Sequence, residues 1–150
     1  MIDIIMFQLN YRHYNPELVE IYQKTINYCR RARFPRKPAV KLNFNDPEFD
    51  DDQFNFMPIN TKPAMVLVEN IDTFDMALKM SHSLNSHEKI LVLNLASDYR
   101  AGGGVAKGSK AQEEDLYRRS NYFQANNPRF YPLASSEAVY SPLVYVVKNK

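Results

Sequence analysis

Hydrophobic residues recur at helical spacing near the start of the chain. Between Glu17 and Arg33, apolar side chains stand three or four positions apart, with polar residues between them. They are Leu18, Ile21, Tyr22, Ile26 and Cys29. This period is typical of a helix with one buried face. The pattern therefore predicts an amphipathic helix over 17–33 that packs against the rest of the protein.

From Pro63 onward, short apolar runs alternate with helical patterns. Such alternation is typical of an α/β fold, in which helices cover a largely parallel sheet. The expected elements are strand Met65–Glu69, helix Thr73–Leu84, strand Lys89–Leu95, helix Lys110–Tyr122 and strand Leu143–Val147.

The stretch from Phe34 to Lys62 follows neither period. It contains four prolines and the acidic run Asp50–Asp52, with several phenylalanines between them. Prolines interrupt regular structure, whereas the aromatic residues argue against complete disorder. We therefore expect a linker or an arm that lies over the core. Two regions follow: 1–62, a helix with an irregular arm, and 63–150, an α/β core.

Three of the four glycines in the chain, Gly102, Gly103 and Gly104, are consecutive, and Gly108 is the fourth. Glycine permits positive φ and close approach to a ligand, so this loop is either a flexible connector or a binding loop. Its place between a predicted strand and a helix favours binding of a phosphate or an acid. Neither Gly-x-Gly-x-x-Gly nor Gly-Lys-Ser/Thr is present, so the known dinucleotide and P-loop patterns do not apply.

Two adjacent glutamates follow the loop. Ser109 and Gln112 have the spacing of a capping box, which would start a helix near Lys110 and place Glu113 and Glu114 in its first turns. Neighbouring helical residues point about 100° apart, so the two carboxylates would differ in role. Acidic residues are also favoured at any helix start. On their own, the two glutamates fit this preference better than a catalytic role.

These residues resemble a known family. Gly102-Gly103-Gly104, seven residues and Gln112-Glu113-Glu114 resemble the signature of poly(ADP-ribose) glycohydrolases of the bacterial type, and the similarity runs over about 63–147. The resemblance implies a macrodomain-like three-layer α/β/α core with an N-terminal extension. It implies hydrolysis of ribose–ribose O-glycosidic bonds, with Glu114 as the general acid/base and Glu113 holding ribose hydroxyls. The three glycines and Gln112 would bind substrate, and no cofactor is implied.

Two further residues are candidate substrate ligands by the same resemblance. Asn94 stands where the family places an Asn or Asp around the ribose, although a strand-end turn explains it equally well. Asp72 resembles the macrodomain Asp near adenine, but a helix N-cap is the preferred interpretation. The family usually has Asn where this chain has Ser97, and Pro where it has Ala101.

Composition sets the outer limits. The chain has 150 residues, of which 45% are hydrophobic, and a net charge of +2, so nucleic acid is an unlikely partner. The basic run from Arg30 to Lys37 fits a solvated helix end better than a polyanion site. A single cysteine, Cys29, and three dispersed histidines argue against disulfides and zinc. With no signal peptide or membrane-length apolar run, we expect a cytoplasmic or nuclear protein.

The sequence ends soon after the strand predicted at Leu143–Val147, before the later strands and the diphosphate-binding loop of the family. We therefore expect a partial core that leaves one edge of its sheet unpaired. A homodimer partner or a complementing chain would pair with that edge. Two alternatives to the hydrolase stay open. One is an ADP-ribose-binding module without turnover, and the other is an interaction or inhibitor protein built on a truncated glycohydrolase fold.

Overall fold

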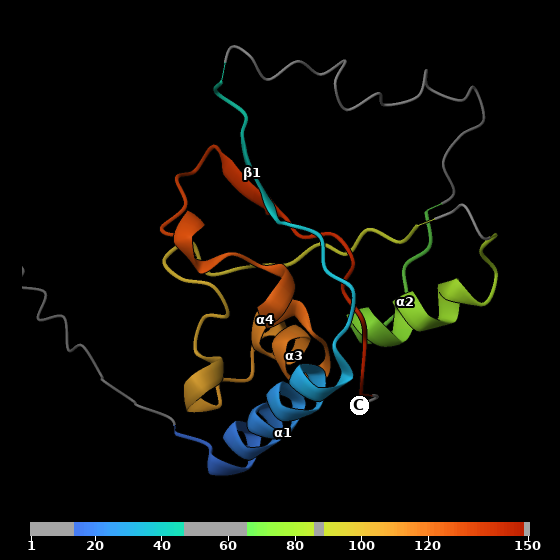
Figure 1. Cartoon of the computed structure of the whole chain (residues 1–150). Helices are drawn as coiled ribbons and strands as arrows, with labels where there is room; N and C mark the ends of the chain where they lie inside the picture. The colour runs from blue at the N-terminus through green and yellow to red at the C-terminus, as the bar shows by residue number, and fades with distance from the viewer. Residues whose placement is uncertain (1–13, 47–65, 86–88, 149–150) are drawn as a thin grey trace, which may run out of the picture.

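The computed structural model describes residues 14–46, 66–85 and 89–148 (Figure 1). Within them the fold is mixed, with four α-helices, two short 3-10 helices and a two-stranded antiparallel sheet. The elements in chain order are α1 (Pro16–Ala32), β1 (Val40–Asn43), α2 (Thr73–Ser81), η2 (Val105–Lys107), α3 (Gln112–Arg119), α4 (Tyr122–Ala125), η3 (Pro128–Phe130) and β2 (Glu137–Tyr140).

The amphipathic helix predicted at 17–33 is confirmed as α1. The Asn15 side chain caps it by accepting a hydrogen bond from the Leu18 amide at 3.2 Å, and Pro16 occupies the first turn, where no amide donor is needed. Its buried residues are Tyr22, Thr25 and Cys29, and Cys29 is completely buried. The spacing of the apolar positions thus selected the face that packs inward.

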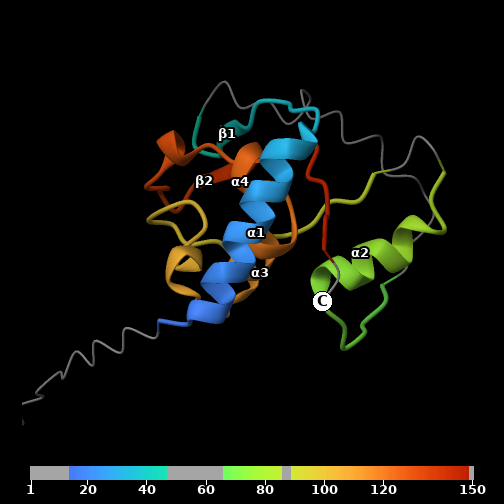
Figure 2. The ribbon, with the colours of Figure 1, turned by 60° about the horizontal axis from the view of Figure 1, so that its bottom comes forward.

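The core lies where α1 crosses α3 and α4 (Figure 2). It is largely aromatic: the Tyr22 and Tyr117 rings lie 6.4 Å apart, and the Tyr117 and Tyr122 rings 4.8 Å apart in an edge-on arrangement. Thr25 of α1 also donates its hydroxyl to the Arg118 carbonyl at 2.5 Å. Aromatic pairs in this geometry stabilise a core beyond their area burial. Residues 105–125 and the N-terminal helix therefore share one core, while the division at residue 62 stays a prediction.

The small sheet was not predicted from the sequence. In β1 and β2 the pairing runs antiparallel from Val40 opposite Tyr140 to Asn43 opposite Glu137. A salt bridge of 2.8 Å between Lys41 and Glu137 crosses the two strands diagonally, since Lys41 stands opposite Val139 and Glu137 opposite Asn43. The segment 34–62 is therefore not irregular throughout, because part of it forms a strand with a partner almost a hundred residues later. Its remainder from 47 lies outside the described residues.

The three strands expected at 65–69, 89–95 and 143–147 are not formed in the described residues, and their prediction is corrected. A strand is held by hydrogen bonds to a neighbouring strand, and these segments have none beyond an isolated bridge between Ser120 and Val146. Residues 66–69 are exposed throughout. In 89–95 the side chains alternate, so that Leu91, Leu93 and Leu95 point outward, 83%, 74% and 74% exposed. The described part of the chain therefore lacks the parallel sheet that the alternation predicted.

Two predicted helices also need correction. The helix expected at 110–122 is divided into α3 and α4, because Ser120 is extended and Asn121 donates its amide to the Tyr145 carbonyl at 3.1 Å. The tertiary bond competes successfully with continuation of the helix. The N-cap of α3 is Ala111, without a side-chain cap, so the capping box at Ser109 is wrong. Helix α2 ends at Ser81, three residues before the expected end.

Candidate functional site

The glycine loop turns back onto the start of α3. Gly102 has φ +76° and Gly103 has φ +50°, in the left-handed region that favours glycine. A Cβ atom on Gly103 would lie 2.7 Å from Glu114 Oε1 and 3.0 Å from Glu113 Oε2. The Gly103 backbone can therefore lie this close to both carboxylates because glycine has no side chain.

Glu113 connects α3 to the loop through both of its oxygens. Oε1 accepts the Gly102 amide at 2.9 Å, and Oε2 accepts the Ser97 amide at 2.9 Å. The residue is only 2% exposed. Burial raises the pKa of Glu113, although the two amides act in the opposite direction, and the neighbouring Glu114 raises it further. Glu113 therefore holds the two sides of the loop at a fixed distance from the helix.

Glu114 is arranged differently. Its Oε1 accepts the Gly104 amide at 2.8 Å, while Oε2 is buried and finds no hydrogen-bond partner among the described residues. A buried carboxylate oxygen without a partner is costly, because desolvation is not compensated. Such an atom needs an explanation, and a functional role is one of the few available. The structure thus separates the adjacent glutamates: each oxygen of Glu113 accepts a backbone amide, whereas one oxygen of Glu114 has no partner among the described residues.

Gln112 fixes the segment that leads into the loop. Its side-chain amide donates to the Leu93 carbonyl at 2.8 Å, and its carbonyl accepts the Leu95 amide at 2.8 Å. These two bonds take the place of the hydrogen bonds that a neighbouring strand would make with the backbone of residues 93 and 95. Asn94 lies between them and donates to the Tyr122 hydroxyl at 3.2 Å, while its own Oδ1 is buried without a partner in the described residues.

Asp72 is the N-cap of α2, as the preferred interpretation predicted. Its carboxylate accepts the amides of Phe74 at 2.9 Å and Asp75 at 3.2 Å. It also pairs with Arg119 at 2.5 Å, and the same guanidinium contacts Asp75 at 2.5 Å. Burial alone would raise the pKa of Asp72, but Arg119 and the two amides outweigh it and lower that pKa. Asp72 therefore anchors α2 to the end of α3.

A cavity of about 370 Å³ opens between the starts of α2 and α3. Asp72 and Gln112 line it together with Ile71, Thr73 and Lys110. The three consecutive glycines and the two glutamates do not line it. The structure therefore brings the predicted site residues into two neighbouring groups. One is formed by the loop, Glu113 and Glu114, and the other is the cavity beside Asp72, with Gln112 between the two groups.

Sequence reasoning missed several residues that shape this region. Tyr117 lies directly under the loop, since a Cβ atom on Gly102 would come within 2.8 Å of its ring. Its hydroxyl accepts a hydrogen bond from Asn126 at 2.8 Å, and burial strongly raises its pKa. Arg119, buried beneath Phe74, joins α2 to α3. The position of Tyr117 one helical turn after Glu113 was the available signal.

The described residues contain no group of three or more His, Cys, Asp or Glu side chains placed to hold a metal ion. They also contain no helix that is long and apolar enough to cross a membrane.

Comparison with known families identifies the class of protein. Residues 4–149 match the family model of the microbial-type PARG catalytic domain, where PARG is poly(ADP-ribose) glycohydrolase. The chain therefore belongs to this family. The resemblance inferred from the glycine and Gln-Glu-Glu motifs is confirmed, and the match begins well before Pro63, the start of the similarity inferred from the sequence. No curated protein and no solved structure showed a significant match.

Proposed function

We propose that this protein hydrolyses the ribose–ribose O-glycosidic bonds of poly(ADP-ribose) and releases ADP-ribose, with Glu114 as the general acid/base. The observation that carries the proposal is the buried, unpartnered Oε2 of Glu114 beside a glycine loop whose Gly104 amide fixes the other oxygen at 2.8 Å. Membership of the microbial PARG family supports the same reaction.

The reaction needs a proton at the leaving oxygen and then a deprotonated water. Protonated Oε2 of Glu114 would give its proton to the glycosidic oxygen as the bond from the anomeric carbon breaks. The resulting carboxylate would stabilise the oxocarbenium-like carbon and then take a proton from the water that attacks it. One held oxygen and one uncommitted oxygen suit this sequence, because the side chain stays oriented while its proton moves.

The remaining candidates would position the substrate. Glu113 holds the loop through the Gly102 and Ser97 amides, and the second lone pairs of its oxygens would accept ribose hydroxyls. The backbone of Gly102, Gly103 and Gly104 would then lie against the ribose and phosphate groups of the substrate. Asn94 Oδ1 supplies a further buried acceptor. Gln112 and Asp72, which line the neighbouring cavity, would hold the distal part of the nucleotide.

The test is release of ADP-ribose from poly(ADP-ribose) by the protein and by Glu114→Gln, which keeps the shape and removes the acid. We expect release to fall at least 10²-fold, the usual contribution of a positioned acid/base. Glu17→Gln is the matched control, since Glu17 is an exposed acid in the first turn of α1. Equal release by Glu114→Gln and the parent chain would disprove the assigned role.

A second function, binding of ADP-ribose without turnover, is favoured by the cavity beside Asp72, which Glu114 does not line. Calorimetric titration with ADP-ribose separates the two functions. Binding without release by the parent chain would establish a binding module. Neither binding nor release would leave the interaction protein as the remaining interpretation.

A further inference from the structure

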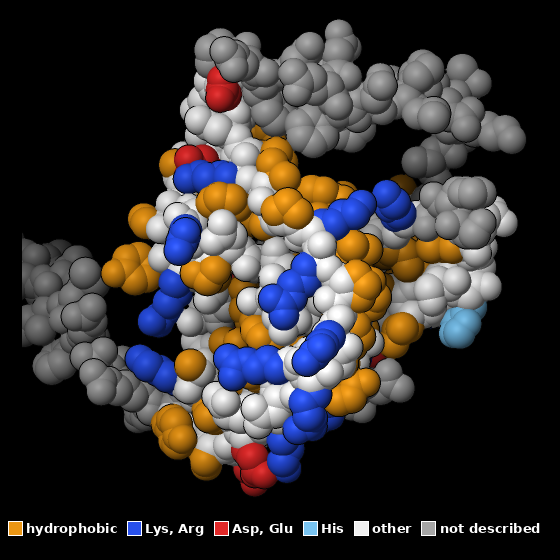
Figure 3. All heavy atoms as spheres, viewed as in Figure 1, with side chains coloured by type: hydrophobic (Ala, Val, Ile, Leu, Met, Phe, Trp, Pro, Cys, Tyr) orange, Lys and Arg blue, Asp and Glu red, His pale blue; other side chains and the backbone are white. Residues whose placement is uncertain are grey.

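The outer end of α1 and the segment after it carry a cluster of cations, here called the basic face. Its residues are Arg30, Arg31, Arg33, Arg36 and Lys37, all exposed. None of them takes part in an ion pair of the described residues, although other cations of that part do, as Lys41 does with Glu137. Figure 3 shows Lys and Arg side chains gathered over this side of the molecule, with few acidic ones. The net charge of only +2 is therefore unevenly distributed.

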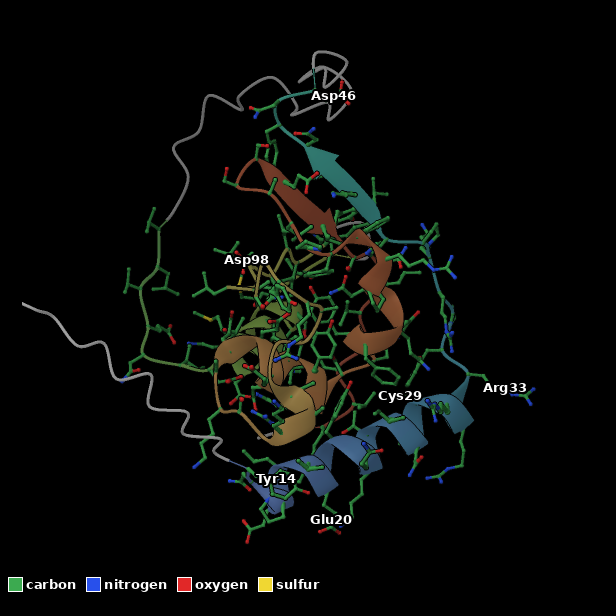
Figure 4. All side chains as sticks on the ribbon, turned by 90° about the vertical axis from the view of Figure 1, so that its left-hand side faces the viewer. Tyr14, Glu20, Cys29, Arg33, Asp46 and Asp98 are labelled. Carbon is green, nitrogen blue, oxygen red and sulfur yellow. The ribbon has the colours of Figure 1, made fainter. Side chains whose placement is uncertain are left out.

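The helix dipole explains only part of this cluster. Arg30 and Arg31 stand in the last turn of α1, where cations are favoured in any helix. Arg33, Arg36 and Lys37 lie beyond the helix, where that stabilisation fades. Figure 4 shows Arg33 at the end of α1, pointing away from the body of the protein. Exposed cations that form no ion pair within the described residues are available to an external anion.

A groove adjoins the basic face. It has a volume of about 160 Å³, lies between α1 and the C-terminal segment, and is lined by Ile21, Lys24, Thr25, Tyr28, Val147 and Lys148. Tyr28 is 50% exposed. Its ring lies 6.3 Å from that of Phe34, which in turn stacks on Tyr145 at 4.9 Å. The groove thus combines two lysines, of which Lys24 pairs with Glu20 at 2.7 Å, with an exposed aromatic ring that packs against Phe34.

Helical spacing joins the groove to the cations. Lys24, Tyr28 and Arg31 are four and three residues apart, so they form one stripe along α1. Alternating cations and exposed aromatic rings are the features by which proteins bind single-stranded polymers of phosphates and bases. The cations neutralise phosphates, and the bases stack on the rings whatever their sequence.

We infer that the basic face and its groove bind a stretch of the poly(ADP-ribose) chain distant from the bond being cleaved. This inference rests on the proposed function. The N-terminal end of α1 touches the glycine loop, since the Asn15 amide donates to the Lys107 carbonyl at 3.0 Å. A helix of 17 residues spans roughly 25 Å, so the basic face lies about that far from the loop. Only a polymer would occupy both places, and long chains would therefore be preferred over short ones.

Binding is measured in a Glu114→Gln background, so that the polymer is not consumed, by fluorescence anisotropy with long poly(ADP-ribose) and with its dimer. The test variant adds Arg31→Gln, Arg33→Gln and Lys37→Gln. We expect weaker binding of the long chain and unchanged binding of the dimer. The slope of log affinity against log salt should fall by roughly 2, since each lost phosphate contact removes about 0.7. The matched control is Lys79→Gln, an exposed lysine of α2 paired with Glu69.

The outcomes distinguish this inference from the proposed function. Unchanged binding of long chains by the triple variant would overturn the inference, whatever the activity of the parent chain. Equal or tighter binding of single-stranded DNA with the same number of phosphates would also overturn it, in favour of a nucleic-acid surface. If the long polymer binds through these residues but the parent chain releases no ADP-ribose, the proposed function fails and the inference stands as polymer binding alone. A Tyr28→Ser variant that weakens long-chain binding with an unchanged salt slope would support the stacking part.

Discussion

Two adjacent glutamates at the start of α3 take different parts in the site. Both carboxylate oxygens of Glu113 accept hydrogen bonds from backbone amides, whereas only one oxygen of Glu114 does. The difference arises from the approximately 100° that separates neighbouring helical residues, which turns each side chain toward a different part of the loop. A single glycine, Gly103, lets the loop approach both carboxylates.

Gly103→Ala is expected to abolish most ADP-ribose release and to lower thermal stability. An alanine at φ +50° costs about 1–2 kcal/mol, and its Cβ would lie 2.7 Å from Glu114 Oε1. Activity and the midpoint of thermal unfolding are measured together, with Ala106→Gly in the neighbouring η2 as a control for general flexibility. Full activity in Gly103→Ala would contradict the assigned contact.

Asp72→Asn should lower stability in a pH-dependent way. The folded pKa of Asp72 lies below its usual value of 3.8, so its contribution is fully present above that value and is lost as pH falls through the folded pKa. Asn keeps the N-cap but loses the ion pair with Arg119. We expect a loss of about 1–3 kcal/mol at pH 7, from urea unfolding, which shrinks as the pH falls through the folded pKa of Asp72. Asp98→Asn, in an exposed loop, is the control, and a gap independent of pH would refute the ion-pair role.

At this scale the sequence was informative where the residues are close together in the chain. The glycine loop and Gln112-Glu113-Glu114 are separated by seven residues, so one motif contained them. The pair of Asp72 and Arg119 spans 47 positions, and no local pattern indicates it. The buried Tyr117 was assigned to a helix, but its place under Gly102 depends on how the loop folds back.

Among the elements, α1 is the one whose buried face could be predicted best. Its apolar period was undisturbed, and the helix begins and ends within one residue of the predicted bounds. The strands were predicted worst, because an apolar run shows that a segment prefers burial but not whether a neighbouring strand is present to pair with it. The break between α3 and α4 was equally invisible, since the bond from Asn121 to Tyr145 joins distant residues.

The docking of α1 onto α3 depends on one buried hydroxyl as well as on rings. Thr25→Val keeps the shape and removes the donor to the Arg118 carbonyl, so we expect a loss of about 1–3 kcal/mol in the free energy of unfolding. Denaturant unfolding measures it. Asn27→Ala, at an exposed position of the same helix, should change stability by less. Equal losses in the two variants would show that the hydroxyl contributes nothing specific.

The described part of the molecule exposes a row of large apolar side chains, which is uncommon on a protein surface in contact with water. Leu91, Leu93 and Leu95 project from one side of an extended segment, and Val66 and Val68 are 84% and 89% exposed. Exposed apolar residues on extended backbone favour pairing with another chain. The homodimer expected from the sequence would cover this row.

Sedimentation velocity at increasing concentration tests that expectation. The parent chain should self-associate, and Leu91→Thr with Leu93→Thr should shift it to monomer, because both side chains point outward and their loss leaves the core intact. Met80→Thr, an apolar residue of α2 that is 48% exposed, is the control. A parent chain that sediments as a monomer at every concentration would exclude a homodimer through this row.

The burial of Cys29 gives the molecule an internal reporter. It is the single cysteine of the chain, it is completely buried on the inner face of α1, and burial raises the pKa of its thiol. Thiol reagents act on the exposed thiolate, so they can modify the protein only when α1 opens away from the residues that cover its inner face. The rate of labelling therefore measures how often this helix opens. No added dye or engineered site is needed. A ligand that binds both ends of α1 would slow the labelling of Cys29. The decrease in rate would measure how strongly the ligand holds the helix in place.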